Sequence, residues 1–255
     1  MQNHFDKRLD PTKLVPGSKS VISLLYNYFP GDDSKAVSDY KIAKYAYGKD
    51  YHFVIKDRLN TFLKELQEEI GEIDGRVFVD SAPVMERQWA VKSGLGWKGK
   101  NTLLINKDQG SYFFLAELII DLELEYDGPI RDYCGTCTKC LDACPTDAFV
   151  GAGVLDASKC ISYLTIELKD EIPEEFRGKY GQWVFGCDIC QEVCPWNRFS
   201  QKHKEQEFLK SEGVKEITEN GWVEFTEEVF RKIFKDSPIK RSKYYGLRRN
   251  IDFIQ

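Results

Sequence analysis

The cysteines are the residues whose spacing most clearly predicts chemistry. All eight lie between Cys134 and Cys194, and none occurs in the first 133 residues or the last 61. A secreted domain held together by disulfides is small, and its cysteines are spread along the whole chain. The concentration of thiols in one segment therefore indicates metal chemistry in a reducing compartment.

The first run of cysteines matches the bacterial ferredoxin pattern C-x2-C-x2-C-x3-C-P, in which the fourth cysteine ligates the other [4Fe–4S] cluster. A second run has the same ending but one cysteine fewer, and the isolated Cys160 can supply the missing thiolate. The ferredoxin crossover predicts a first cluster on Cys134, Cys137, Cys140 and Cys194. It predicts a second cluster on Cys144, Cys160, Cys187 and Cys190.

Structural zinc is the alternative interpretation, because paired C-x2-C motifs are also typical of zinc ribbons. A zinc ion takes four thiolates but has no use for the x2-x2-x3-Pro pattern, which occurs once in full and once truncated. We therefore favour two [4Fe–4S] clusters, which would pass electrons to each other and on to another group.

A glycine-rich loop from Gly94 to Asn101 nearly matches the phosphate-binding P-loop, G-x4-G-K-[ST]. Asn101 replaces the magnesium-binding hydroxyl, and the loop follows a predicted helix where a P-loop follows a strand. These two departures exclude an ATPase. The loop is either an ordinary turn, which the pattern alone favours, or a clasp for a bulky polar cofactor.

One carboxylate, Asp80, follows an apolar strand pattern and precedes Pro83. It is either a cap for the next helix, which the local sequence favours, or a general acid whose pKa is raised by an apolar pocket. The three histidines, His4, His52 and His203, are too scattered to suggest a triad or a metal site. His52 could face a pocket, but the sequence favours a structural histidine.

The end of the chain is basic although the whole chain has a net charge of −5. The segment 235–252 has a local net charge of +4, and two tyrosines alternate with its cations. This composition suits contact with phosphates and stacking of bases, although an ordinary solvated surface is the alternative. The RNA-binding candidates are Lys240, Arg241, Lys243, Arg248 and Arg249.

The segments before the cysteines alternate between strand and helix patterns. Strand-like apolar runs cover residues 21–25, 77–79, 102–106 and 112–120, the last of which could also be helical. Residues 58–70 have one apolar face and predict an amphipathic helix. Pro83 can begin a second helix that runs to residue 93 and ends at Gly94.

The tail contains one further helix pattern, with Val229, Phe230, Ile233 and Phe234 on one face and Thr226 as the cap. We therefore predict an α/β or α+β layered domain over residues 1–128, the cysteine segment 129–200, and a charged tail domain 201–255.

The composition predicts a soluble, globular chain. Apolar residues make up 42% of it, which is enough for a core and excludes general disorder. No apolar run reaches the roughly 20 residues that cross a bilayer, and the amino terminus has no apolar signal core. We expect a cytoplasmic monomer that does not bind membranes.

Six segments spread over almost the whole chain together resemble the epoxyqueuosine reductases. They are KRLDPTKLVPGSKSVI, VDSAPVMERQWAVKSGLGWKGKNTLLI, CGTCTKCLDACPTDAF, CISYLTIE, FGCDICQEVCPWN and SPIKRSKYYGLRRNI. The resemblance implies an α+β fold, with an α/β-type cobalamin-binding domain, a ferredoxin-like double [4Fe–4S] domain and a small helical basic tail. Members of this family usually begin earlier, and many continue into helical repeats, so this chain resembles a shortened member.

The resemblance also implies roles for particular residues. Asp80 falls on the proposed proton donor of the family, and the cluster ligands agree with the crossover given above. The corrin-contacting loops of the family fall on Gly96, Trp97, Lys98, Gly99, Lys100 and Asn101, and on Ser162 and Thr165. These residues are the expected contacts of a cobalamin that alternates between cob(II)alamin and cob(I)alamin.

The implied substrate is the epoxide of epoxyqueuosine in a tRNA anticodon loop, which the last step of queuosine biosynthesis reduces to an alkene. This conversion takes two electrons and two protons, so a low-potential external donor must supply the electrons through cofactors. For this step Asp80 is expected to be neutral, and therefore buried or desolvated. The alternatives are a ferredoxin-like electron carrier and a corrin enzyme that resembles the reductive dehalogenases.

Overall fold

The structure is a computed structural model that describes residues 4–31, 40–212, 214, 215 and 226–255. Its central element is a three-stranded sheet in the order β1-β6-β3. The strands are β1 (Ser20–Asn27), β3 (Gly75–Phe78) and β6 (Phe113–Ile120). Both pairings are antiparallel, so of the two predicted classes, α/β and α+β, the sheet in this part of the chain is of the α+β kind.

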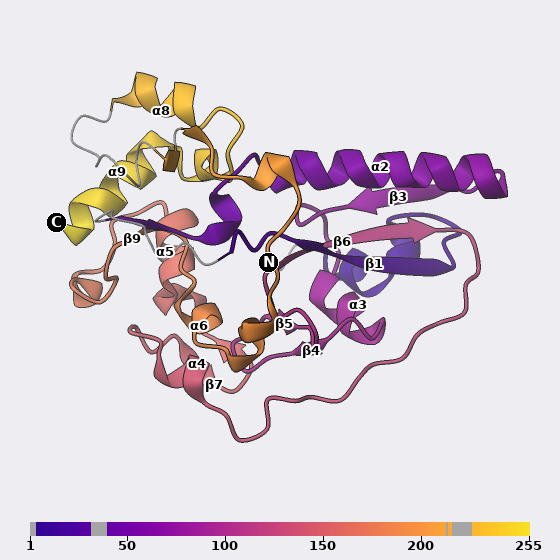
Figure 1. The fold of residues 1–255 in the computed structure, drawn as a ribbon, viewed down its shortest axis with the longest axis horizontal. Helices are drawn as coiled ribbons and strands as arrows, with labels where there is room; N and C mark the ends of the chain where they lie inside the picture. Colours follow the sequence, from indigo (N-terminus) through magenta and orange to yellow (C-terminus); the bar gives the residue numbers. More distant parts are fainter. Residues whose placement is uncertain (1–3, 32–39, 213, 216–225) are drawn as a thin grey trace.

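Two helices cover opposite faces of this sheet (Figure 1). The long helix α2 (Tyr51–Ile70) begins seven residues before the predicted start, because the Asp50 carboxylate caps it by accepting the His52 amide N–H. The short helix α3 (Glu86–Lys92) begins three residues after Pro83, where the prediction placed its start.

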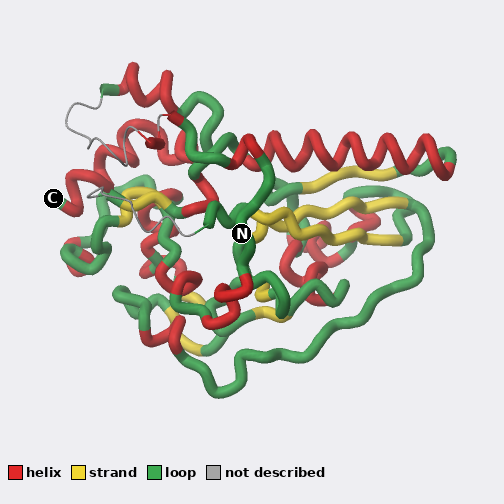
Figure 2. The backbone as a smooth tube through the Cα atoms, viewed as in Figure 1, coloured by secondary structure: helices red, strands yellow, loops and turns green. Residues whose placement is uncertain are grey.

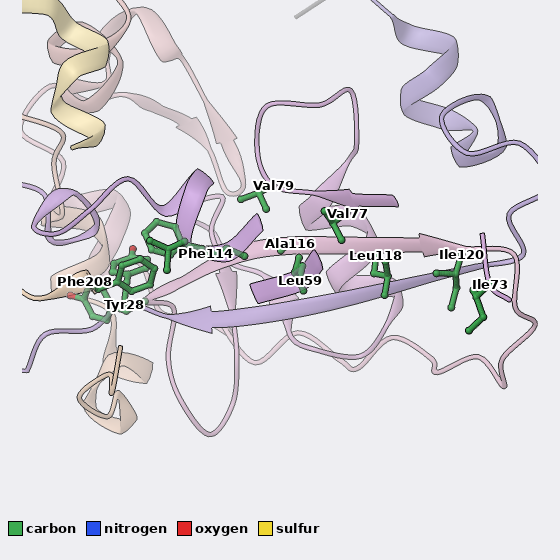
Figure 3. Close-up of a cluster of buried hydrophobic side chains, with 13 residues drawn as sticks. Tyr28, Leu59, Ile73, Val77, Val79, Phe114, Ala116, Leu118, Ile120 and Phe208 are labelled. Carbon is green, nitrogen blue, oxygen red and sulfur yellow. The ribbon is translucent and has the colours of Figure 1, made fainter. Parts of the chain in front are cut away.

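The core between α2 and the sheet follows from the alternation of side chains along β6. Phe114, Ala116, Leu118 and Ile120 pack with Leu59 of α2 (Figure 3). Because successive strand residues point to opposite faces, Glu117 and Ile119 face the side that α3 covers. A buried glutamate on this inner face of the sheet is unexpected.

The second half of the chain is built from short elements around the cysteines. A segment of residues 121–138 without helix or strand leads from β6 around the molecule to the first of them (Figure 2). The elements that follow are α4 (Lys139–Asp142), β7 (Phe149–Gly151), β8 (Val154–Leu155), α5 (Ile161–Ile166), β9 (Trp183–Phe185) and α6 (Ile189–Glu192). Short elements suit this region because the cysteine loops determine its backbone course.

The tail consists of α8 (Glu227–Ile233), the 3₁₀ helix η7 (Pro238–Ser242) and α9 (Lys243–Ile254). The Thr226 hydroxyl accepts the Val229 amide N–H, which confirms the predicted cap. Further elements in the described part of the chain are α1 (Phe5–Leu9), β2 (Lys41–Ile42), β4 (Trp97–Lys98) and β5 (Leu104–Ile105).

A second core joins parts of the chain that the sequence analysis assigned to different domains. Ile42 on β2 packs with Phe185 on β9 and with Phe234 and Leu247 of the tail, and β2 pairs with β9 in parallel. The division at residues 128 and 200 stays a prediction. Among the described residues, no helix is both long and apolar enough to span a membrane.

Candidate active site and thiol pockets

The structure gathers the eight cysteines around two pockets, and none of the eight forms a disulfide. The first thiol pocket is lined by Cys134, Cys137, Cys140 and Cys194. The second thiol pocket is lined by Cys144, Cys160, Cys187 and Cys190. These are the two sets of four that the ferredoxin crossover predicts.

The crossing arises because α4 and α6 pack against each other, and each carries the middle of one cysteine run. The last cysteine of each run lies beyond its helix, next to a proline, and lines the pocket of the opposite run. Burial raises the pKa of the Cys187 thiol to about 12 and also raises the pKa of Cys140, Cys160 and Cys194. Thiolates in these positions therefore require cations beside them.

The glycine-rich loop braces the first thiol pocket. The Trp97 indole N–H donates to Cys134 Sγ at 3.3 Å, and Lys100 Nζ donates to the Gly135 and Cys137 carbonyls at 2.7 and 3.0 Å. Asn101 is buried and donates to the Cys190 carbonyl at 3.3 Å. The loop is thus neither a P-loop nor a free turn, since its side chains hold the cysteine loops in place.

Close packing explains the glycines of this loop. A Cβ atom at Gly99 would lie 2.5 Å from Ile105 Cδ1, and one at Gly96 would lie 2.3 Å from the Ile105 carbonyl oxygen. In the second loop expected to contact a corrin, Thr165 is buried and donates to the Ile161 carbonyl at 2.7 Å. Lys98 is exposed and Ser162 is partly exposed, so both are accessible to a ligand.

Asp80 is the second residue after β3 and has a left-handed backbone, at φ 51°. Its Oδ2 accepts a hydrogen bond from the Tyr51 hydroxyl at 2.7 Å and lies 3.3 Å from His52 Nε2. Its amide N–H donates to Glu86 Oε1 at 2.5 Å. Met85 stands at the N-cap position of α3, so the interpretation of Asp80 as the cap of that helix is wrong.

The environment of the Asp80 carboxylate also differs from the expectation of a buried, neutral acid. Its side chain is 58% exposed. The hydrogen bond from His52 and that from Tyr51 hold the pKa of Asp80 below its usual range, although partial burial opposes them. In this structure Asp80 is therefore an ionised carboxylate paired with His52.

Sequence reasoning missed His52 as a site residue, because its partners come together only in three dimensions. Its Nδ1 lies 2.8 Å from Asp50 Oδ1, on the side away from Asp80. These two carboxylates raise the pKa of His52 to about 9. The adjacent tyrosine and histidine at a helix start were the available signal, but neither spacing nor composition pointed to Asp80.

A second missed feature is the buried carboxyl group of Glu117, which is 0% exposed behind the Asp80 loop. Among the described residues, neither of its oxygens has a hydrogen-bond partner of good geometry. Burial and the neighbouring Glu86 carboxylate raise the pKa of Glu117 to about 9, and burial also raises the pKa of Glu86. Glu117 is therefore protonated at neutral pH.

This burial predicts that Glu117→Gln changes how stability depends on pH. The folded chain keeps a proton on Glu117 that the unfolded chain releases above its ordinary pKa, so stability falls as the pH rises from about 5 to 9. Glutamine is uncharged at every pH. Relative to the parent chain, the free energy of unfolding of the variant should therefore rise by about 1 kcal/mol per pH unit over this range. Denaturant unfolding at several pH values measures the difference, with the exposed Glu69→Gln as control. If the free energy of unfolding depends on pH in the same way in parent and variant, Glu117 is not protonated in the folded chain.

The basic tail is only partly available to a ligand. Arg249 is half-buried and its guanidinium donates to the Leu164, Leu168 and Asp170 carbonyls, so its role is internal. Arg241 pairs with Glu167, and Arg248 pairs with Asp252. Lys240 and Lys243 are exposed.

The tail lies near Asp80 although 161 residues separate Arg241 from it. The hydrogen bond to Glu167 is the main cause of the raised pKa of Arg241, and the negative charge of Asp80 adds to it across the fold. A surface pocket of about 540 Å³, here called the tail pocket, lies beside the end of α5. Its lining includes Lys169, Arg241, Lys243, Tyr245 and Arg249.

Over its whole length the chain is 65% identical to a relative from Cyclobacterium marinum named epoxyqueuosine reductase, and it spans 82% of that relative. The chain belongs to the epoxyqueuosine reductase family. Residues 8–81 match the family model described as "Epoxyqueuosine reductase QueG, DUF1730". Residues 133–197, which include all eight cysteines, match the model of a 4Fe-4S double cluster binding domain.

Solved structures of the epoxyqueuosine reductase family have the same fold. One contains a tRNA-Tyr epoxyqueuosine-modified stem loop and is 34% identical, with a TM-score of 0.85 over 96% of this chain and 66% of that chain. Another, from Bacillus subtilis, is 33% identical, with a TM-score of 0.86 over 98% of this chain and 68% of that chain. Family membership makes this chain an oxidoreductase with iron–sulfur clusters.

Proposed function

We propose that this chain reduces the epoxide of epoxyqueuosine in a tRNA anticodon loop to the alkene of queuosine. The observation that carries the proposal is the position of Asp80. Its exposed carboxylate pairs with His52 and also interacts electrostatically with Arg241 of the basic tail. The relative solved with an epoxyqueuosine-modified stem loop supports the choice of substrate. A single-stranded loop suits this site, because presenting its base costs little unstacking energy.

Each thiol pocket offers the donor set of a [4Fe–4S] cluster, namely four cysteine sulfurs, which come from two segments in the first pocket and from three in the second. We assign the first cluster to Cys134, Cys137, Cys140 and Cys194, and the second to Cys144, Cys160, Cys187 and Cys190. The two crossing cysteines, Cys144 and Cys194, support this assignment because each lines the pocket of the other run.

Cobalamin is the proposed second cofactor, and the residues around the glycine-rich loop fit it. The loop braces the first thiol pocket, and its exposed Lys98 would be available to hold a corrin there. Ser162 is the other accessible candidate contact. When bound, the clusters and cobalamin supply the two low-potential electrons that no side chain can provide.

The chain's own residues then provide positioning and protons. The left-handed turn after β3 exposes the Asp80 carboxyl, and the Glu86 carboxylate holds that turn by accepting the Asp80 amide N–H. Tyr51 donates to the carboxyl and fixes its direction. Asp80 is the group that passes a proton to the epoxide oxygen as its bond to carbon breaks.

Anaerobic reconstitution with iron, sulfide and cobalamin tests the function. The loaded protein receives dithionite and epoxyqueuosine-containing tRNA, and nucleoside mass spectrometry follows the loss of one oxygen atom. We expect conversion that requires cobalamin. Clusters that cycle between redox states in a chain that binds no corrin would contradict the proposal and indicate an electron carrier.

The exposed lysines of the tail are the proposed RNA contacts, together with the tail pocket. Replacing Lys240 and Lys243 with glutamine should weaken tRNA binding and reduce the salt slope of log K by about 2, since each phosphate contact contributes about one unit. Filter binding at several salt concentrations measures both quantities. Lys64→Gln on the exposed side of α2 is the matched control, and an unchanged slope in the double variant would contradict the assignment.

A further inference from the structure

His52 is held between two carboxylates in the first turn of α2. Its Nδ1 lies 2.8 Å from Asp50 Oδ1, and its Nε2 lies 3.3 Å from Asp80 Oδ2. Each ring nitrogen thus faces a carboxylate oxygen, and this arrangement favours the imidazolium, in which both nitrogens carry protons. Asp50 also caps α2 and is fixed by that role, so it orients the ring.

Aromatic stacking fixes the plane of the His52 ring. The ring stacks on Tyr51 with centroids 4.2 Å apart, and Tyr51 stacks on the buried Phe114 at 4.1 Å. The His52 side chain is 29% exposed, whereas that of Asp80 is 58% exposed. A ligand therefore reaches Asp80 more easily than His52, and His52 stands behind it.

The charged and titratable groups around this pair come from four elements. α2 contributes Asp50 and Tyr51, and the turn after β3 contributes Asp80. Glu86 of α3 holds the Asp80 amide, and Arg241 of η7 interacts with Asp80 across the fold. His52 is the only cation in direct contact with Asp80 among the described residues.

From this geometry we propose that His52 is the proton relay that recharges Asp80 during turnover, with Asp50 as its orienting partner. This role rests on the proposed function, and it makes His52 a positioning and proton-holding residue that acts through Asp80. The proposed function needs Asp80 to donate a proton, although Asp80 is ionised in the structure. The relay resolves this conflict, because the His52–Asp80 pair holds the proton on His52.

The relay conserves atoms and charge. The N–H bond at His52 Nε2 breaks as an O–H bond forms on Asp80, and that bond breaks in turn as the epoxide oxygen gains the proton. His52 then takes a new proton from solvent and supplies the second one, so that the oxygen leaves as water. The external low-potential donor supplies the two electrons that balance the reduction.

Histidine NMR of the intact cluster-loaded protein tests the resting state without any turnover. The chain has three histidines, and His52→Gln identifies the signal of His52. We expect His52 to titrate near pH 9, as the two carboxylates dictate. Asp50→Asn keeps a good capping side chain but removes one charge, so it should lower this midpoint by about one unit. A His52 midpoint near 6.5 in the parent chain would overturn the relay.

The pH profile of single-turnover reduction tests the transfer step. At pH 7.5 His52→Gln should be roughly 10 to 100 times slower than the parent chain, and the gap should close toward pH 5, where solvent protonates Asp80 directly. His4→Gln, a substitution of an exposed histidine at the amino-terminal end, should leave the profile unchanged.

A purely structural histidine predicts an equal loss at every pH, and this result would overturn the proposal. The proposed function fails in a different way, namely when the parent chain removes no oxygen from epoxyqueuosine at any pH. The two failures are therefore distinguishable in one series of measurements.

Discussion

Asp80→Asn is expected to reduce turnover by roughly two to four orders of magnitude, which is the usual contribution of a general acid. An amide has the shape of the carboxyl group but cannot pass a proton to the epoxide oxygen. Asparagine also tolerates the left-handed conformation at φ 51° better than most residues, so the turn after β3 should be retained. The loss of turnover should therefore come from the missing proton transfer and not from a change in structure.

Three controls separate a loss of chemistry from a loss of structure in Asp80→Asn. Iron and sulfide content, cobalamin binding and the thermal midpoint should all match those of the parent chain. Asp74→Asn, at the exposed residue just before β3, should leave turnover unchanged. Near-normal turnover by Asp80→Asn would show that another group protonates the leaving oxygen.

The crossover of the cluster ligands predicts which pairs of cysteine substitutions damage one cluster and which damage both. Cys137 and Cys194 line the same pocket although 57 residues separate them. Replacing both with alanine should therefore abolish one cluster and leave about half of the iron. Cys137 and Cys144 belong to one run but line different pockets, so replacing both should abolish both clusters.

Iron and sulfide analysis with electron paramagnetic resonance of the reduced proteins distinguishes the two double variants. The two alanine pairs are matched, because each removes two thiols and each includes Cys137. If each run instead held its own cluster, the outcomes would exchange, and the crossover would be wrong. Both variants should lose epoxide reduction, since a broken electron path is enough to stop it.

The sequence by itself determined the chemistry of the cysteine segment. Cluster ligands lie in short loops whose spacing is dictated by the metal group, so a local pattern predicts them, and the pockets have the expected sets of four. The strand around residues 21–25 was predictable because its apolar character is a local property, whereas the apolar run 112–120 also allowed a helix and only the structure shows a strand there. Thr226 was identified as a helix cap because capping depends on the residue type directly before the helix, which is also a local property.

Only the tertiary structure decided how the catalytic residues meet. Asp80 and His52 are 28 residues apart, and they touch because α2 packs on the sheet whose strand β3 ends two residues before Asp80. The packing of α3 on the other face of the sheet buries Glu117 beside Glu86. The packing of the tail brings Arg241 within electrostatic reach of Asp80 and turns Arg249 inward. Charges and pKa values depend on neighbours in space and on burial, and neither is encoded in local spacing.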